Sequence, residues 1–221
     1  FSERDVVQLP SRELVMADVV GVSRGYEQRR LAALDELTEA HFAVASVQAA
    51  AQRTMPPEAL KAAIVSLATG ETAPLDELAQ SLTRAGYERC VQVEGTGQFS
   101  IRGGILDVFP PQAEHPYRVE FWDDEIDSIS TFDVGSQRRL EQCECLRCLP
   151  CMESIPALAK GGAAGLAKAV LALTSTRRKK QHADLQTNLE RDAERLRETG
   201  SLPAADKYMP LIYPEMATAF H

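Results

Sequence analysis

The alternation of apolar and polar residues is densest between residues 86 and 139. Short segments with a period of two are separated there by clusters of Gly, Pro or Asp, which is typical of strands joined by turns. The segments are residues 91–94, 99–102, 105–109, 117–122 and 125–132. The pattern predicts a small antiparallel sheet.

Successive side chains of a strand point to opposite faces, so residues 99–102 (FSIR) and 118–122 (RVEFW) divide into an apolar and a polar set. The polar set contains Arg102, Arg118 and Trp122, which is the only tryptophan of the chain. Tryptophan and arginine are enriched at the energetic centres of protein interfaces. The alternation alone fits equally well a solvated face that carries one isolated aromatic residue.

A helix is predicted for residues 74–85, because Leu75, Leu78 and Leu82 form one apolar stripe and Gly86 follows. This helix would cover the apolar face of the sheet, as in an α+β domain. A shorter helical stretch is predicted for residues 57–66, followed by a turn at residues 69–71.

The sequence before the sheet is typical of the end of an α/β unit. Ser23 is a candidate N-cap for a helix that runs through Leu31 and Leu37, and residues 42–46 have the apolar run of a buried parallel strand. A helical turn follows at residues 47–53.

After the sheet, the pattern predicts a strand and then two helices. The strand is expected at residues 140–149, an Ala- and Leu-rich helix at 160–173, and a long polar helix at 176–199 that begins with the basic run 177–180.

Composition and charge narrow the functional classes. The chain has 221 residues, 44% of them hydrophobic and 25% charged, which are ordinary values for globular domains. Its formal net charge of −8 argues against a protein that wraps nucleic acid. No run is long and apolar enough to cross a bilayer, and the start FSERDVV is not a signal peptide, so we expect no membrane partner and a cytoplasmic location. Because the chain begins with Phe, we expect it to be a piece of a longer protein.

Four of the five cysteines cluster as Cys143, Cys145, Cys148 and Cys151. Thiolate pairs two residues apart are common in zinc sites. However, a single strand would place Cys143 and Cys145 on one face and Cys148 on the other, and no second Cys or His loop completes a tetrahedral set. Structural cysteines are the favoured interpretation, and a zinc or redox role stays open.

No catalytic set is suggested by the spacing of residues. The glycine-rich stretch 161–168 lacks the adjacent Gly-Lys-Ser/Thr of a phosphate loop, so we interpret it as a helix start. Asp123, Asp124, Glu125 and Asp127 fit a hairpin turn better than a metal site, because Asp tolerates the positive φ of such turns. We therefore expect no enzyme activity and no cofactor in this segment.

Several longer motifs carry a family resemblance. The motifs are GY at 86, FSIRGG at 99, PYR at 116 and QR at 137, with LPSRE, LPCMES and PLIY in the flanks. Together they resemble the N-terminal module of the bacterial transcription-repair coupling factors (Mfd), which is in turn similar to the excision-repair protein UvrB.

The resemblance implies a partial Rossmann-like α/β domain, of the degenerate helicase type, interrupted by an inserted α+β domain with an antiparallel sheet. Residues 1–53 and 139–221 would form the two parts of the first domain, with its N-terminal strands missing, and residues 54–138 the insert.

In the family, the insert docks UvrA, and the interface positions correspond to Arg102, Arg118 and Trp122. The family commonly has Phe at the position of Trp122, which would alter the fit of the aromatic anchor. RNA polymerase, DNA, ATP and Mg would be bound by other domains of the parent, an ATP-dependent DNA translocase.

The sequence thus predicts a UvrA-recruiting interaction module that links stalled RNA polymerase to nucleotide excision repair. The alternative is a DNA-contacting fragment of a UvrB-like excision-repair protein. UvrB would show a phosphate loop and an aromatic-rich hairpin, and neither occurs in this sequence.

Overall fold

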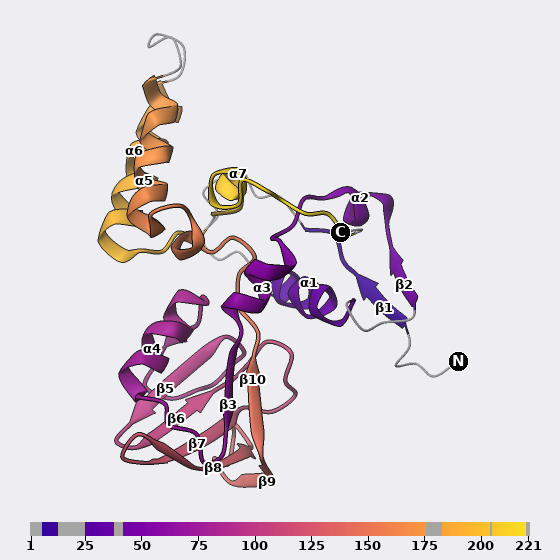
Figure 1. Ribbon diagram of the computed structural model, residues 1–221, viewed down its shortest axis with the longest axis vertical. Helices are drawn as coiled ribbons and strands as arrows, with labels where there is room; N and C mark the ends of the chain where they lie inside the picture. The colour runs from indigo at the N-terminus through magenta and orange to yellow at the C-terminus, as the bar shows by residue number, and fades with distance from the viewer. Residues whose placement is uncertain (1–5, 13–24, 38–41, 176–182, 204, 220–221) are drawn as a thin grey trace.

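The computed structural model describes residues 6–12, 25–37, 42–175, 183–203 and 205–219. Figure 1 shows a lower body built around a sheet, a projecting helical hairpin, and a small α/β unit at the N-terminal end. The fold is a mixed α/β arrangement that includes antiparallel sheets, as the sequence predicted. The predicted N-cap Ser23 and the basic run 177–180 lie outside the described residues.

The N-terminal unit is a parallel strand pair joined through a helix. Strands β1 (Val6–Leu9) and β2 (Phe42–Ala45) pair in parallel, and α1 (Gly25–Glu36) lies between them in sequence. The parallel strand was predicted correctly, but its burial was not, because all four residues of β2 are exposed. In the described part of the chain this sheet has only two strands, so β2 lacks the cover that makes an apolar run a buried one. Helix α2 (Val47–Ala51) follows and is capped by the hydroxyl of Ser46.

The central element is a six-stranded sheet in which neighbours along the chain lie side by side. Every adjacent pair is antiparallel except the first. Its strands, in spatial order, are β4 (Glu88–Arg89), β5 (Gln98–Arg102), β6 (Ile105–Val108), β7 (Tyr117–Trp122), β8 (Glu125–Phe132) and β9 (Arg139–Cys143).

Four of the five predicted strand segments are confirmed as β5 to β8, whereas the strand at residues 91–94 is wrong. Those residues form an irregular loop, which Ser100 fixes by donating its hydroxyl to the carbonyl of Val91 (2.9 Å).

Helix α4 (Leu75–Arg84) packs on one face of the six-stranded sheet, as predicted. Leu78 and Leu82 contact a core that includes Phe99 and Val119 of the sheet. The helix ends where Gly86 adopts φ +92°, a conformation that glycine accepts readily. We call this the inner face of the sheet.

A second strand pair closes the same core. Strand β3 (Val65–Ala68) pairs antiparallel with β10 (Cys145–Cys148). Two predictions are therefore wrong: helix α3 is confined to Pro57–Ala63, and residues 140–149 form two strands rather than one. Val65 and Leu67 alternate with Ser66, and their side chains pack against the core. This segment is therefore more stable as a strand paired with β10 than as an extension of helix α3. Between β9 and β10, the carbonyl of Glu144 accepts a hydrogen bond from Thr69 N (3.0 Å).

The C-terminal part is a helical hairpin followed by short turns. Helices α5 (Gly162–Ser175) and α6 (Ala183–Thr199) pack side by side and project from the body (Figure 1). The short elements are the 3-10 helices at Pro156–Leu158 and Ala205–Tyr208, and α7 (Met209–Ile212). Both long helices were predicted, and Gly200 ends α6. No helix in the described ranges is long and apolar enough to cross a membrane.

A buried ion cluster joins the N-terminal unit to the two segments that enter and leave the sheet, at Thr54 and Glu153. Glu153 has no solvent exposure and pairs with Arg12 and Arg30 at 3.3 Å each. Its carboxylate also accepts a hydrogen bond from Thr54, and its carbonyl accepts one from the Tyr213 hydroxyl (3.0 Å). Thr54 precedes the sheet in sequence and Glu153 follows it. The predicted domain boundaries at residues 53 and 138 stay a prediction. The sheet itself continues past residue 138, because β9 is its last strand.

Candidate partner-docking face

The outer face of the sheet, opposite α4, is organised in rows that run across the strands. Ser100, Asp107, Arg118 and Ser130 are direct neighbours on β5, β6, β7 and β8. The next row toward the 103–104 and 123–124 turns contains Arg102, Ile105, Glu120 and Ser128. Arg102 and Arg118 therefore share one face, and Trp122 points to the same side because its neighbour Phe121 packs against the inner core. This is the face that the alternation predicted.

Asp107 lies between the two arginines and is buried, with 1% of its side chain exposed. Arg118 donates to both of its oxygens, from Nε to Oδ1 at 2.7 Å and from Nη2 to Oδ2 at 2.9 Å. Arg102 donates from Nη2 to Oδ2 at 2.7 Å. Charge-assisted bonds of this length, with one guanidinium held at two points, are among the strongest side-chain hydrogen bonds.

Arg118 is held from several sides, and only 15% of its side chain is exposed. Its guanidinium carbon lies 4.5 Å from the centre of the buried Phe132 ring, and Nη2 donates to Gln137 Oε1 at 3.2 Å. The hydrogen bonds to Asp107 raise the pKa of Arg118, and burial opposes that rise. Arg118 therefore forms a flat, fixed part of the face rather than a mobile cation.

Arg102 is more accessible, with 49% of its side chain exposed. It ends β5 at the Gly103-Gly104 turn, where Gly103 adopts φ +60°. Among the described residues, the hydrogen bond to Asp107 is the one found for the Arg102 side chain. Its remaining N–H groups are free to meet a partner.

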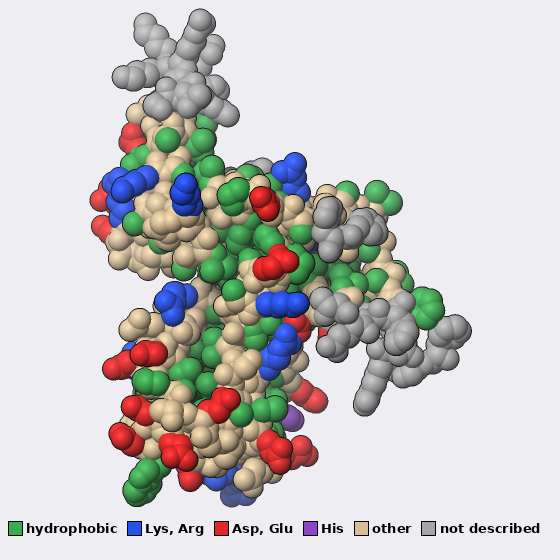
Figure 2. Space-filling model, in the orientation of Figure 1, with side chains coloured by type: hydrophobic (Ala, Val, Ile, Leu, Met, Phe, Trp, Pro, Cys, Tyr) green, Lys and Arg blue, Asp and Glu red, His purple; other side chains and the backbone are tan. Residues whose placement is uncertain are grey.

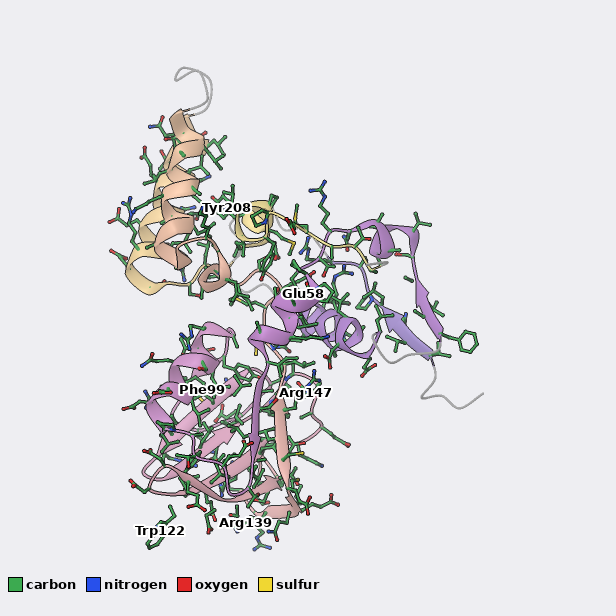
Figure 3. The ribbon with its side chains drawn as sticks, viewed as in Figure 1. Glu58, Phe99, Trp122, Arg139, Arg147 and Tyr208 are labelled. Carbon is green, nitrogen blue, oxygen red and sulfur yellow. The ribbon has the colours of Figure 1, made fainter. Side chains whose placement is uncertain are left out.

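Trp122 is 82% exposed and is the last residue of β7. Figure 3 shows its ring extending away from the sheet, whereas Phe99 lies inside the body. Asp123 and Asp124 form the predicted two-residue turn, with Asp123 at φ +58°. An exposed indole at the end of a hairpin presents a large apolar surface to a partner.

A second ion pair lies on the same face. Glu120 pairs with Arg139 of β9 and accepts a hydrogen bond from the Ser128 hydroxyl at 3.1 Å. The hydrogen bond from Arg139 lowers the pKa of Glu120, and the Ser128 bond acts in the same direction. Figure 2 shows Asp and Glu side chains distributed over the visible side of the lower body.

The sequence reasoning found the three outward residues but missed what holds them. Asp107 is the main omission, and its signal was present in residues 105–108 (ILDV): with Leu106 and Val108 inward, Asp107 must share the face of Arg118. Gln137 and Phe132 come from a loop and a strand end, and alternation within one strand does not reveal such contacts.

The cysteines are divided between two strands and the core. Cys143 ends β9 and is half-buried, Cys145 begins β10 and is exposed, and Cys148 and Cys151 are buried. Burial raises the pKa of Cys148 to about 12, so its thiol stays protonated at neutral pH. Within the described ranges, no three His, Cys, Asp or Glu residues are arranged to hold a metal ion.

Comparison with known proteins gives a family context for this face. Residues 65–153, from β3 to the buried Glu153, match the UvrB interaction domain family. The transcription-repair-coupling factor of Bacillus subtilis is 34% identical over 99% of the chain, and that of Haemophilus influenzae 28% over 100%. The chain is similar along its whole length to a segment of the transcription-repair-coupling factors. The predicted resemblance is thereby confirmed.

The match covers only part of each relative. The chain spans 19% of the length of the Bacillus subtilis transcription-repair-coupling factor and 18% of the Haemophilus influenzae one. The Escherichia coli transcription-repair-coupling factor is 34% identical over 69% of the chain, which is 14% of that relative. The matched family segment includes all six strands of the sheet with β3 and β10, so the whole docking face lies within it.

Proposed function

We propose that this chain recruits UvrA through the outer face of the six-stranded sheet. The observation that carries the proposal is an exposed tryptophan on the same face as two arginines that share Asp107, in a segment that matches the UvrB interaction domain family. In the parent protein, this recruitment would link a stalled RNA polymerase to nucleotide excision repair.

The three residues have different tasks in this proposal. Trp122 is the apolar anchor, which enters a pocket on UvrA and loses most of its 82% exposure. Arg102 pairs with an acidic group of UvrA through the N–H groups that Asp107 does not occupy. Arg118, which is largely buried, contributes its exposed edge and keeps the surface beside Arg102 flat.

The remaining activities belong to the longer parent. We propose that this segment has no catalytic role or cofactor of its own, and that ATP, Mg, DNA and RNA polymerase are bound elsewhere in the parent, in the cytoplasm. We further propose that residues 1–53 and 139–221 form one α/β domain around the insert 54–138. Limited proteolysis of the parent would test this division.

The direct test is UvrA binding by the purified chain and its variants. We expect Trp122→Ala, and the double variant Arg102→Ala/Arg118→Ala, each to weaken binding at least thirtyfold, because loss of a central anchor costs about 2 kcal/mol or more. Matched controls are Tyr26→Ala, an exposed aromatic on α1, and Arg195→Ala on α6, which should bind as the wild type does.

Retention of wild-type affinity in both anchor variants would show that UvrA docks elsewhere. Duplex DNA provides the second comparison. Binding that falls steeply with salt would favour the DNA-contacting alternative, since phosphate contacts release counterions.

A further inference from the structure

Arg102 and Arg118 of the docking face depend on the same buried carboxylate, Asp107. We propose that Asp107 is a positioning residue for partner binding: it sets the geometry of Arg102 and Arg118 without itself contacting the partner. This inference rests on the proposed UvrA-docking function and adds to it the group that organises the face.

The hydrogen-bond pattern gives the two arginines different degrees of freedom. Oδ1 of Asp107 accepts from Arg118 Nε, and Oδ2 accepts from Arg118 Nη2 and Arg102 Nη2 together. Arg118 is therefore fixed at two points and Arg102 at one. Because Asp107 is on the central row and Arg102 on the next row toward the turns, this single bond directs Arg102 back over the sheet.

Electrostatics explains why a carboxylate is needed at this position. Two guanidinium groups that donate to one oxygen atom are close enough to repel each other, and the negative charge between them compensates for that repulsion. The trio of Arg102, Asp107 and Arg118 carries a net charge of +1. Without the carboxylate, the more exposed Arg102 would turn outward into water.

Burial separates a positioning role from direct contact. With 1% of its side chain exposed, Asp107 offers no surface to a partner, whereas Arg102 and Trp122 do. The partner chemistry that fits is an acidic side chain beside an apolar pocket: Arg102 meets the acid, and Trp122 enters the pocket.

The test is a double-mutant cycle with Asp107→Asn, which keeps the shape of the side chain and removes its charge. We expect UvrA affinity to fall about tenfold in Asp107→Asn, and not to fall further when the change is added to Arg102→Ala/Arg118→Ala, since residues of one network couple strongly. Asp76→Asn on α4, at the opposite face, removes the same charge and should leave affinity unchanged.

Two results would overturn the inference. In the first, Asp107→Asn binds as tightly as the wild type, or more tightly because the face gains positive charge. In the second, Asp107→Asn causes the same loss with and without the two arginines, which would indicate a general structural effect. Circular dichroism checks that the variant is folded. If Asp107→Asn is not folded, Asp107→Glu replaces it. This variant keeps the charge but shifts both arginines, so the inference requires Asp107→Glu to weaken UvrA binding.

A readout without UvrA keeps this inference separate from the proposed function. In the wild type, the Arg118 Nε proton should give a slowly exchanging NMR resonance, because it is hydrogen-bonded to Asp107 in a buried site. That resonance should be lost in Asp107→Asn and retained in Trp122→Ala. Its absence from the wild type would refute the positioning role, whereas absence of UvrA binding by the wild type would refute the proposed function.

Discussion

Asp107 holds Arg102 and Arg118 on the outer face of the sheet and Glu120 holds Arg139, but the two carboxylates differ in exposure. Asp107 is buried, whereas 28% of the Glu120 side chain is exposed. Exposed ion pairs typically contribute less than about 1 kcal/mol, while a buried charge left without its partner is costly. The two carboxylates should therefore respond differently to substitution.

Glu120→Gln should change the acid dependence of stability. The folded-state pKa of Glu120 is lowered, mainly by the hydrogen bond from Arg139, so its contribution is complete above the unfolded pKa and is lost as pH falls through the folded value. We expect the variant to be less stable than the wild type by under about 1 kcal/mol near pH 7, with the difference disappearing as pH falls below about 4. Urea unfolding at several pH values measures this. A difference that grows on acidification would contradict it.

Trp122→Ala should separate binding from stability. The indole is 82% exposed and belongs to none of the buried clusters, so its removal should change the free energy of unfolding by no more than about 0.5 kcal/mol. Urea unfolding is the measurement, and Phe99→Ala, which truncates a fully buried ring, is the comparison, with an expected loss of about 3–5 kcal/mol. A large loss in Trp122→Ala would mean that the ring supports the fold.

At the scale of elements, the connections between the sheet and the α/β unit are held by buried charge. Glu153 pairs with Arg12 and Arg30, and Arg30 has no solvent exposure. Burial lowers the pKa of Arg30, and the charge of Glu153 opposes that shift. The same carboxylate bonds to Thr54, so the segments that enter and leave the sheet are tied together.

Glu153→Ala should therefore strongly lower the free energy of unfolding. Its removal leaves Arg30 buried without a counter-charge, for which we expect a loss of about 3–5 kcal/mol in the free energy of unfolding. Glu141→Ala on the exposed strand β9 is a matched control and should have little effect. Denaturant unfolding of both variants decides the matter: equal stability would show that the cluster is not needed to hold the two connections.

The sequence predicted elements well where a local pattern was sufficient. The hairpins over residues 98–132 follow from alternation and turn residues, and α4 follows from its leucine stripe and Gly86. Two predictions failed where distant pairing decides: β3 exists because β10 pairs with it, and β9 and β10 separate because they join different sheets. Residues 91–94 have strand-like alternation, but they lie beside β5 as a loop.

At the scale of the whole molecule, the inner face of the sheet is covered, and the outer face is exposed at Arg102 and Trp122 but buried along its central row at Ser100, Asp107 and Ser130. Helix α4 and the β3–β10 pair cover the inner face, while the ion cluster around Glu153 joins the sheet to the α/β unit. Trp122 lies at the end of the body remote from the helical hairpin (Figures 1 and 3). Sequence could place the three outward residues on one face, but the ring of contacts around Arg118 depends on the folded sheet.

The single tryptophan allows the central claim to be tested directly. Labelling with 5-fluorotryptophan gives one ¹⁹F resonance, from Trp122, because the chain contains no other tryptophan. We expect unlabelled UvrA to shift and broaden this resonance in the wild type, and to leave it unchanged in Arg102→Ala/Arg118→Ala at the same concentrations. If UvrA binds and the resonance keeps the position and width of the free chain, docking through this face is contradicted. It is contradicted equally if no complex forms at saturating UvrA.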